Sequence, residues 1–129
     1  MSDAVLDSSA VLAVILEEPG AERVVAYLPG AKLSAVNAGE VVAKLRDLAM
    51  PEQTVEAILT GLQVDIRPHA RGDALSAGFL RPATRVAGLS LGDRACLALA
   101  ASLGLPAITA DRSWQSVADD IGVEIATIR

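Results

Sequence analysis

Near the N-terminus the sequence reads Ala4-Val5-Leu6-Asp7-Ser8-Ser9, and these residues give the clearest indication of the fold class. Residues 4–7 predict a short buried strand, because three apolar side chains precede the aspartate. Ser8 and Ser9 are typical cap residues for a helix, which we expect at residues 8–17. A strand followed at once by a helix is the first unit of an α/β domain.

The rest of the chain repeats this alternation. Further short strands are predicted at residues 32–34, 64–66, 107–109 and 123–126. Helices are predicted at residues 21–28, from 36 to near Pro51, onward from Pro51, at 70–87 with an interruption or a bend near Pro82, and at 91–103. Strands that alternate with helices form a parallel sheet whose two faces are both covered. The fold class is therefore α/β, with a five-stranded parallel sheet in three α/β/α layers.

Length and composition favour one domain that spans residues 1–129, because no Gly-, Ser- or Pro-rich break divides the chain. The net charge of −5 argues against a protein that holds nucleic acid by a basic surface. The start of the chain has no basic region, and the apolar run 10–16 is too short to span a membrane. We therefore expect a cytoplasmic protein with no membrane partner.

Two residue types limit the chemistry further. Cys96 is the only cysteine, so an internal disulfide is excluded, and its apolar neighbours predict a small buried side chain. His69 is the only histidine, which argues against zinc sites with several imidazoles and against Ser-His catalysis.

Two acidic residues follow predicted strands. Asp7 comes directly after the first strand and Asp111 shortly after the fourth. In open α/β sheets ligands bind beyond the carboxyl ends of the strands, so both side chains are expected at the same edge. Each also has a purely structural interpretation, helix capping for Asp7 and a surface turn for Asp111, so neither is decisive alone.

A third acid lies on the helix that begins near residue 36. Asn37 and Glu40 are three residues apart, which places both side chains together near the start of that helix. The alternative is an exposed pair of Glu40 with Lys44, whose i, i+4 order contributes only about 0.3–0.5 kcal/mol. That pair is compatible with either interpretation.

The fourth acid, Asp93, opens the helix at residues 91–103. Ser90 and Asp93 have the spacing of a capping box, which is a sufficient structural reason for the aspartate. The helix behind it is apolar on all sides and must be buried, so its polar start is expected to face a cleft or an edge. Clustered carboxylates repel one another unless a cation neutralises them, and hard oxygen ligands suit Mg²⁺ or Mn²⁺.

Four segments that contain these acids resemble the PIN-domain family, and within it the VapC-type toxins. They are Val5-Leu6-Asp7-Ser8-Ser9-Ala10, Ser34-Ala35-Val36-Asn37-Ala38-Gly39-Glu40-Val41, Gly88-Leu89-Ser90-Leu91-Gly92-Asp93-Arg94 and Thr109-Ala110-Asp111-Arg112-Ser113-Trp114. The resemblance covers nearly the whole chain in the right order and spacing.

The resemblance implies a metal-dependent endoribonuclease that arrests translation by cleaving RNA. It also implies a cognate antitoxin protein as partner and a homodimer. By motif, the acids that hold Mg²⁺ or Mn²⁺ are Asp7, Glu40, Asp93 and Asp111, with Ser9, Asn37 and Thr109 as polar neighbours that orient them. Some members carry a further acid two residues after the position of Asp111. Ser113 stands there in this chain, which favours one divalent ion over two.

Two other functions remain compatible with the pattern. One is a PIN-like binding module without catalysis, which the retention of all four acids argues against. The other is a phosphoacceptor receiver-type domain, which needs paired acids after its first strand and a lysine after its last. Here Asp7 is followed by two serines, and no lysine follows Lys44.

Overall fold

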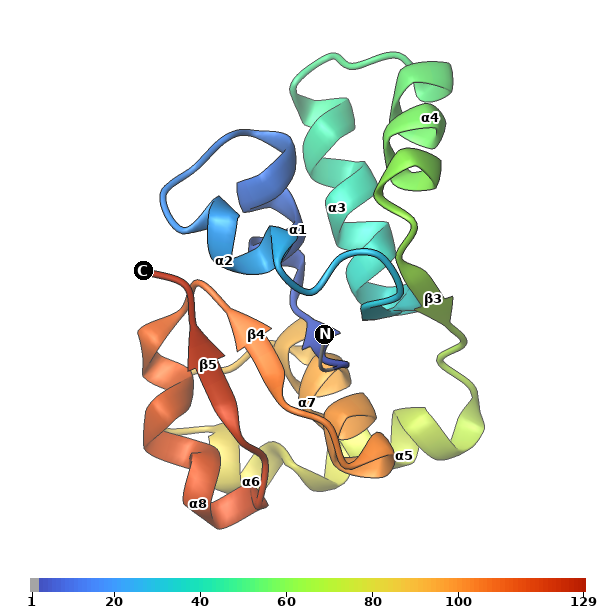
Figure 1. Ribbon diagram of the computed structural model, residues 1–129. Helices are drawn as coiled ribbons and strands as arrows, with labels where there is room; N and C mark the ends of the chain where they lie inside the picture. Colours follow the sequence, from blue (N-terminus) through green and yellow to red (C-terminus); the bar gives the residue numbers. More distant parts are fainter. Residues whose placement is uncertain (1–2) are drawn as a thin grey trace.

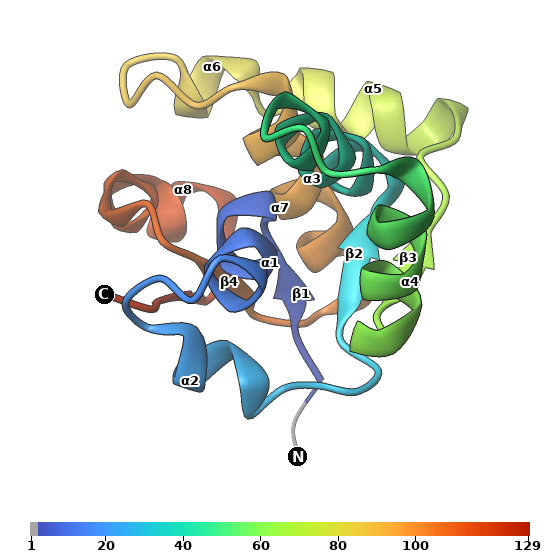
Figure 2. The same ribbon diagram turned by 90° about the horizontal axis from the view of Figure 1, so that it is seen from above.

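A five-stranded parallel sheet forms the middle layer of the computed structural model, which describes residues 3–129 (Figures 1 and 2). Its strands are β1 (Val5–Leu6), β2 (Lys32–Ser34), β3 (Asp65–Arg67), β4 (Ala107–Thr109) and β5 (Ile125–Thr127). They lie in the order β3-β2-β1-β4-β5, and every neighbouring pair is parallel. The predicted three-layer α/β class is confirmed.

Two hydrophobic cores lie on opposite faces of this sheet. Val5 and Leu6 of β1 are both fully buried, and because side chains alternate along a strand they enter different cores. Leu6 packs with Val11 and Val41, whereas Val5 packs with Leu97 and Trp114. A strand buried on both sides explains why the first apolar stretch of the sequence has no polar alternation.

The helices divide between the two cores. The Leu6 core receives side chains from α1 (Ser8–Ile15), α2 (Ala21–Val25), α3 (Ala35–Asp47) and α4 (Glu52–Leu62). The Val5 core receives them from α7 (Leu91–Leu103), the 3₁₀ helix η1 (Arg112–Val117) and α8 (Ala118–Ile121). Helices α5 (Arg71–Phe79) and α6 (Arg81–Thr84) lie outside α7 (Figure 2). No helix within residues 3–129 has the length and apolar character of a membrane span.

The structure corrects several predicted boundaries. The interruption expected near Pro82 is present, since residues 70–87 form two helices, α5 and α6, which meet at Leu80, and the second ends at Thr84 rather than at residue 87. Pro82 has no N–H to donate to the carbonyl of Gly78, so the first helix cannot continue through it. The third and fifth strands begin one and two residues later than expected, and the short helices η1 and α8 have no counterpart in the prediction.

The strand order positions the acidic residues. β1 pairs with β2 on one side and with β4 on the other, so the order reverses between β1 and β4. Ligands of open α/β sheets bind at the carboxyl ends of strands at such a switch point. Asp7 follows β1 and Asp111 follows β4, so both stand at this position. Receiver-type domains have the strand order 2-1-3-4-5, which this chain does not share.

Candidate acidic site

Asp7 is the buried centre of the site, with only 3% of its surface exposed. Its Oδ2 atom accepts hydrogen bonds from Ser9 Oγ at 2.7 Å and from Thr109 Oγ1 at 3.0 Å. Its Oδ1 atom is equally buried and has no hydrogen-bond partner among residues 3–129. One carboxylate oxygen is therefore fixed by two hydroxyl groups, whereas the other is a buried polar atom without a hydrogen-bond partner, which calls for an explanation.

The same hydroxyl groups tie the first turn of α1 to the end of β4. Ser9 Oγ accepts a hydrogen bond from the backbone N–H of Ala110 at 2.9 Å. Thr109 Oγ1 accepts one from the N–H of Asp111 at 3.1 Å. Ser9 and Thr109 thus hold Asp7 in one orientation and also fix the backbone that leads to Asp111.

Burial raises the pKa of the Asp7 carboxyl from 3.8 to about 6. Loss of hydration is the largest cause, and the negative charge of Asp93 adds to it. The hydrogen bonds from Ser9 and Thr109 act in the opposite direction, because they stabilise the charged form. A carboxylate under these conditions gains strongly from a nearby cation.

Asn37 joins α3 to α7 at the other side of the site. Its side chain is fully buried, and Nδ2 donates to Glu40 Oε1 at 2.8 Å and to the carbonyl oxygen of Gly92 at 3.0 Å. The Oδ1 atom of Asn37 has no partner within the described part of the chain. Glu40 is exposed and forms no ion pair with Lys44 among the described ion pairs, so its carboxylate is oriented by Asn37.

Asp93 caps α7 and also lies near other acidic side chains. Its Oδ2 accepts the N–H of Ser90 at 2.8 Å, and Ser90 Oγ accepts the N–H of Asp93 at 3.2 Å, which completes a capping box at the start of α7. Burial, with the negative charges of Asp111 and Glu40, raises the pKa of Asp93. A helix cap can therefore belong to an acidic site.

Asp111 lies at the surface, as Glu40 does. It is exposed, and its Oδ1 accepts the N–H of Ser113 at 2.9 Å at the start of η1. The expected surface turn is therefore present, although the charge of Asp111 is close enough to raise the pKa of Asp93.

The four acids are near one another, but in this structure their carboxylates do not surround a common point within residues 3–129. Within residues 3–129 no three acidic, histidine or cysteine side chains have the spacing of a bound metal ion. Like charges repel, and the side chains of Asp93 and Asp111 are turned toward backbone N–H groups of their own helices. The donors still fit a hard divalent cation, because they are all oxygens and the unpartnered Oδ1 of Asp7 is among them.

Cys96 lies beneath this site and is chemically inert there. The thiol is fully buried, and loss of hydration raises its pKa well above the usual range. The charges of Asp7, Asp93 and Glu40 act in the same direction. The prediction of a small buried side chain is confirmed.

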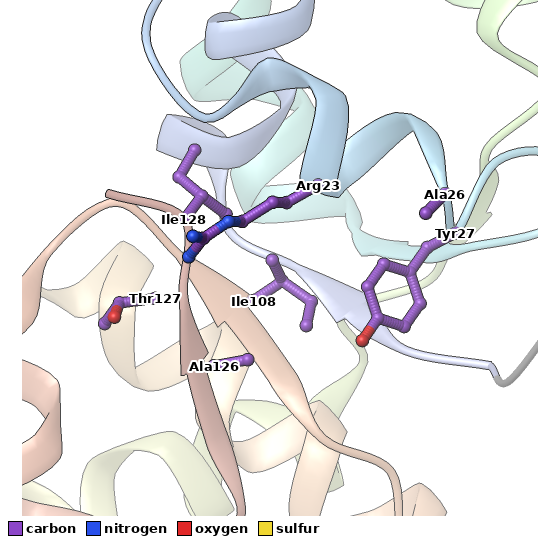
Figure 3. Close-up of a pocket in the computed structure, with 7 residues that line it drawn as sticks. All are labelled: Arg23, Ala26, Tyr27, Ile108, Ala126, Thr127 and Ile128. Carbon is purple, nitrogen blue, oxygen red and sulfur yellow. The ribbon is translucent and has the colours of Figure 1, made fainter.

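A separate pocket of about 480 Å³ lies between α2 and the strands β4 and β5 (Figure 3). Arg23 extends toward Ile128, and Tyr27 stands at the opposite end of the pocket. None of the predicted site residues lines it; its walls are Arg23, Ala26, Tyr27, Ile108, Ala126, Thr127 and Ile128. The four acids thus lie outside this pocket.

Comparison with known proteins identifies the family. The PIN domain model matches residues 4–120, so this chain belongs to the PIN domain family. A search of curated proteins gives no match.

Several solved structures share the fold across nearly the whole chain. A toxin-antitoxin complex from Klebsiella pneumoniae is similar with a TM-score of 0.73 and 18% identity over 98% of both chains. VapBC2 from Rickettsia felis, bound to a DNA fragment from its promoter, has a TM-score of 0.74 and 12% identity over 99% of this chain and 100% of its own. VapBC-1 from nontypeable Haemophilus influenzae has a TM-score of 0.68 and 20% identity over 98% of both chains.

The pKa of Asp7 predicts how the metal-free protein responds to pH. Between pH 3.8 and about 6 the folded state binds a proton that the unfolded state has lost, so the free energy of unfolding falls as pH rises through this window. Asp7→Asn removes the titration, and its amide oxygen still accepts both hydroxyl bonds. In EDTA at pH 7 we expect the variant to exceed wild type by roughly 1–3 kcal/mol in urea unfolding, with a smaller difference at pH 4.

Asp120→Asn is the matched control, because it removes the same charge at an exposed position of α8. Its difference from wild type should not change between the two pH values. The explanation fails if Asp7→Asn retains the pH dependence of wild type.

Proposed function

We propose that this chain is a single-domain, divalent-metal-dependent endoribonuclease and the toxin of a toxin-antitoxin pair, which arrests translation by cleaving RNA. The proposal places its activity in the cytoplasm, where translated RNA is found. Mg²⁺ is the proposed cofactor, and Mn²⁺ its replacement in assays.

One observation carries the proposal more than any other. Asp7 is a buried carboxylate with one oxygen fixed and one without a partner, at the switch point of an α/β sheet. The charge of Asp93 acts on it, and the charges of Asp111 and Glu40 act on Asp93. Membership of the PIN domain family supports a nuclease function for such a site.

The four carboxylates, Asp7, Glu40, Asp93 and Asp111, are the proposed ligands of the cation. A divalent ion held by these residues would supply positive charge to a scissile phosphodiester and to a hydrolytic water. Ser9 and Thr109 keep Asp7 oriented, and Asn37 keeps Glu40 oriented, so that little reorganisation is needed. One of these four carboxylates would also accept the proton of the water.

An antitoxin protein is the proposed partner. The similar structures from Klebsiella, Rickettsia and Haemophilus are of toxin-antitoxin complexes or VapBC proteins, which supports such a pairing. An acidic site also attracts a basic side chain of a regulator, because the charges are complementary. We infer that the antitoxin inhibits by placing a cationic segment over the four acids.

The nuclease proposal predicts that Asp7→Asn and Asp93→Asn abolish Mn²⁺-dependent RNA cleavage. Each removes an anionic oxygen from the proposed ion site, so we expect a fall of at least about 100-fold in the initial rate, beyond the usual effect of an outer-sphere change. The assay is gel analysis of a structured RNA with added MnCl₂, and Asp120→Asn, at an exposed position of α8, serves as the control that keeps the wild-type rate.

Wild-type rates of RNA cleavage in both variants would contradict the nuclease proposal. RNA binding without cleavage by the wild type, at any divalent-ion concentration, would instead favour a non-catalytic binding module. If the wild type does cleave RNA, mapping of RNA 5′ ends after induced expression, with Asp7→Asn as the control, would identify the RNA that is cut.

A homodimer is the proposed assembly, through the face formed by α5 and the start of α7. Leu75 and Phe79 lie one helical turn apart on α5 and are both exposed, with Phe79 79% accessible. Leu91, the first residue of α7, is exposed as well, and α7 packs directly on α5. Exposed apolar side chains that gather on adjacent helices are typical of an interface.

Phe79→Asp is therefore expected to convert the dimer to a monomer in size-exclusion chromatography with light scattering, because it places a charge in a desolvated interface. Val25→Asp is the matched control: Val25 is also exposed, but it lies on α2. A wild-type monomer, or a Phe79→Asp dimer as stable as that of wild type, would contradict this assembly.

A further inference from the structure

Gly92, the second residue of α7, lies against the carboxylate of Glu40 from α3. Gly92 is buried, and a Cβ atom built on it would stand 2.5 Å from Glu40 Oε1 and 2.6 Å from Cδ, with Oε2 closer still. Favourable contact between heavy atoms needs about 3.5 Å. The carboxylate of Glu40 therefore occupies the space that any other residue at position 92 would fill with its side chain.

The backbone gives no other reason for a glycine at this position. Gly92 is helical and does not have the positive φ that favours glycine. Within a helix, alanine is more favourable than glycine by roughly 1 kcal/mol. The three nearest heavy atoms that a methyl group at position 92 would meet all belong to the Glu40 carboxylate.

Asn37 holds the other side of this contact. Its Nδ2 group donates both to Glu40 Oε1 and to the carbonyl oxygen of Gly92, so one buried amide links the carboxylate to the turn that it lies on. The residue after Gly92 is Asp93. The contact therefore sets the position of Glu40 relative to the next acid of the site.

We propose that Gly92 is a positioning residue, whose missing side chain lets the Glu40 carboxylate reach the place from which it binds the divalent ion. This inference rests on the proposed function, since it assigns Glu40 to that ion. Gly92 itself touches neither ion nor RNA. With a methyl group at position 92, Glu40 must turn toward solvent and away from Asn37 and Asp93.

The test is Mn²⁺ binding to Gly92→Ala, measured by isothermal titration calorimetry. We expect at least about tenfold weaker binding than for wild type, the range found when a group that orients a metal ligand is removed. Unfolding by urea in EDTA should be unchanged or slightly more difficult, because Glu40 is exposed and can move without breaking the core. Gly39→Ala is the matched control: it is helical, adjacent to Glu40, and its Cβ would meet nothing within 4 Å.

A second variant separates positioning from a general effect on α7. Glu40→Asp shortens the side chain by one methylene, so its carboxylate no longer reaches position 92. Gly92→Ala should therefore weaken Mn²⁺ binding by a smaller factor in the Glu40→Asp protein than in wild type. Equal factors in the two backgrounds, or wild-type binding by Gly92→Ala, would overturn the inference. Absence of Mn²⁺ binding in wild type would overturn the proposed function together with it, whereas binding without RNA cleavage would overturn only the nuclease.

Discussion

The buried carboxylate of Asp7 is the constraint on which the rest of the site depends. A charged group with almost no exposure is unfavourable unless it is compensated. Two hydroxyl groups compensate one oxygen, and the other oxygen has no partner within residues 3–129. The raised pKa of Asp7 shows that these hydrogen bonds do not fully offset the loss of hydration. A divalent ion at Oδ1 would compensate the buried charge. The same carboxylate that weakens the metal-free fold would therefore favour metal binding.

The sheet creates this situation, because β1 is central and buried on both faces. Its carboxyl end opens where the strand order reverses, which brings Asp7 beside the end of β4 and the start of α7. Ser9, Thr109 and Asn37 then connect α1, β4, α3 and α7 through side-chain hydrogen bonds. The net charge of −5 makes such a site costly without cations and gives RNA no general attraction. The positive charge of the proposed divalent ion would both stabilise the acidic site and attract an RNA phosphate.

The sequence predicts the parts of this molecule that depend on local pattern. The buried strands β1 and β4, the apolar helix α7 and the capping box of Asp93 all follow from short-range rules, and the strand-end positions of Asp7 and Asp111 follow from them. The break at Leu80 also follows from a local rule, because Pro82 is visible in the sequence. The helices after Asp111 and the strand order depend on tertiary packing, which a single sequence does not reveal. Gly92 is missed for the same reason: its importance arises only when Glu40, fifty-two positions earlier, is folded against it.

Whether the unpartnered oxygen of Asp7 binds a divalent ion can be seen in a crystal structure with Mn²⁺, through the anomalous scattering of manganese. We expect an anomalous peak about 2.1 Å from Asp7 Oδ1, with at least one oxygen of Glu40, Asp93 or Asp111 turned toward it. A structure in which manganese binds only elsewhere, with Asp7 Oδ1 still unpartnered at saturating Mn²⁺, would contradict this expectation.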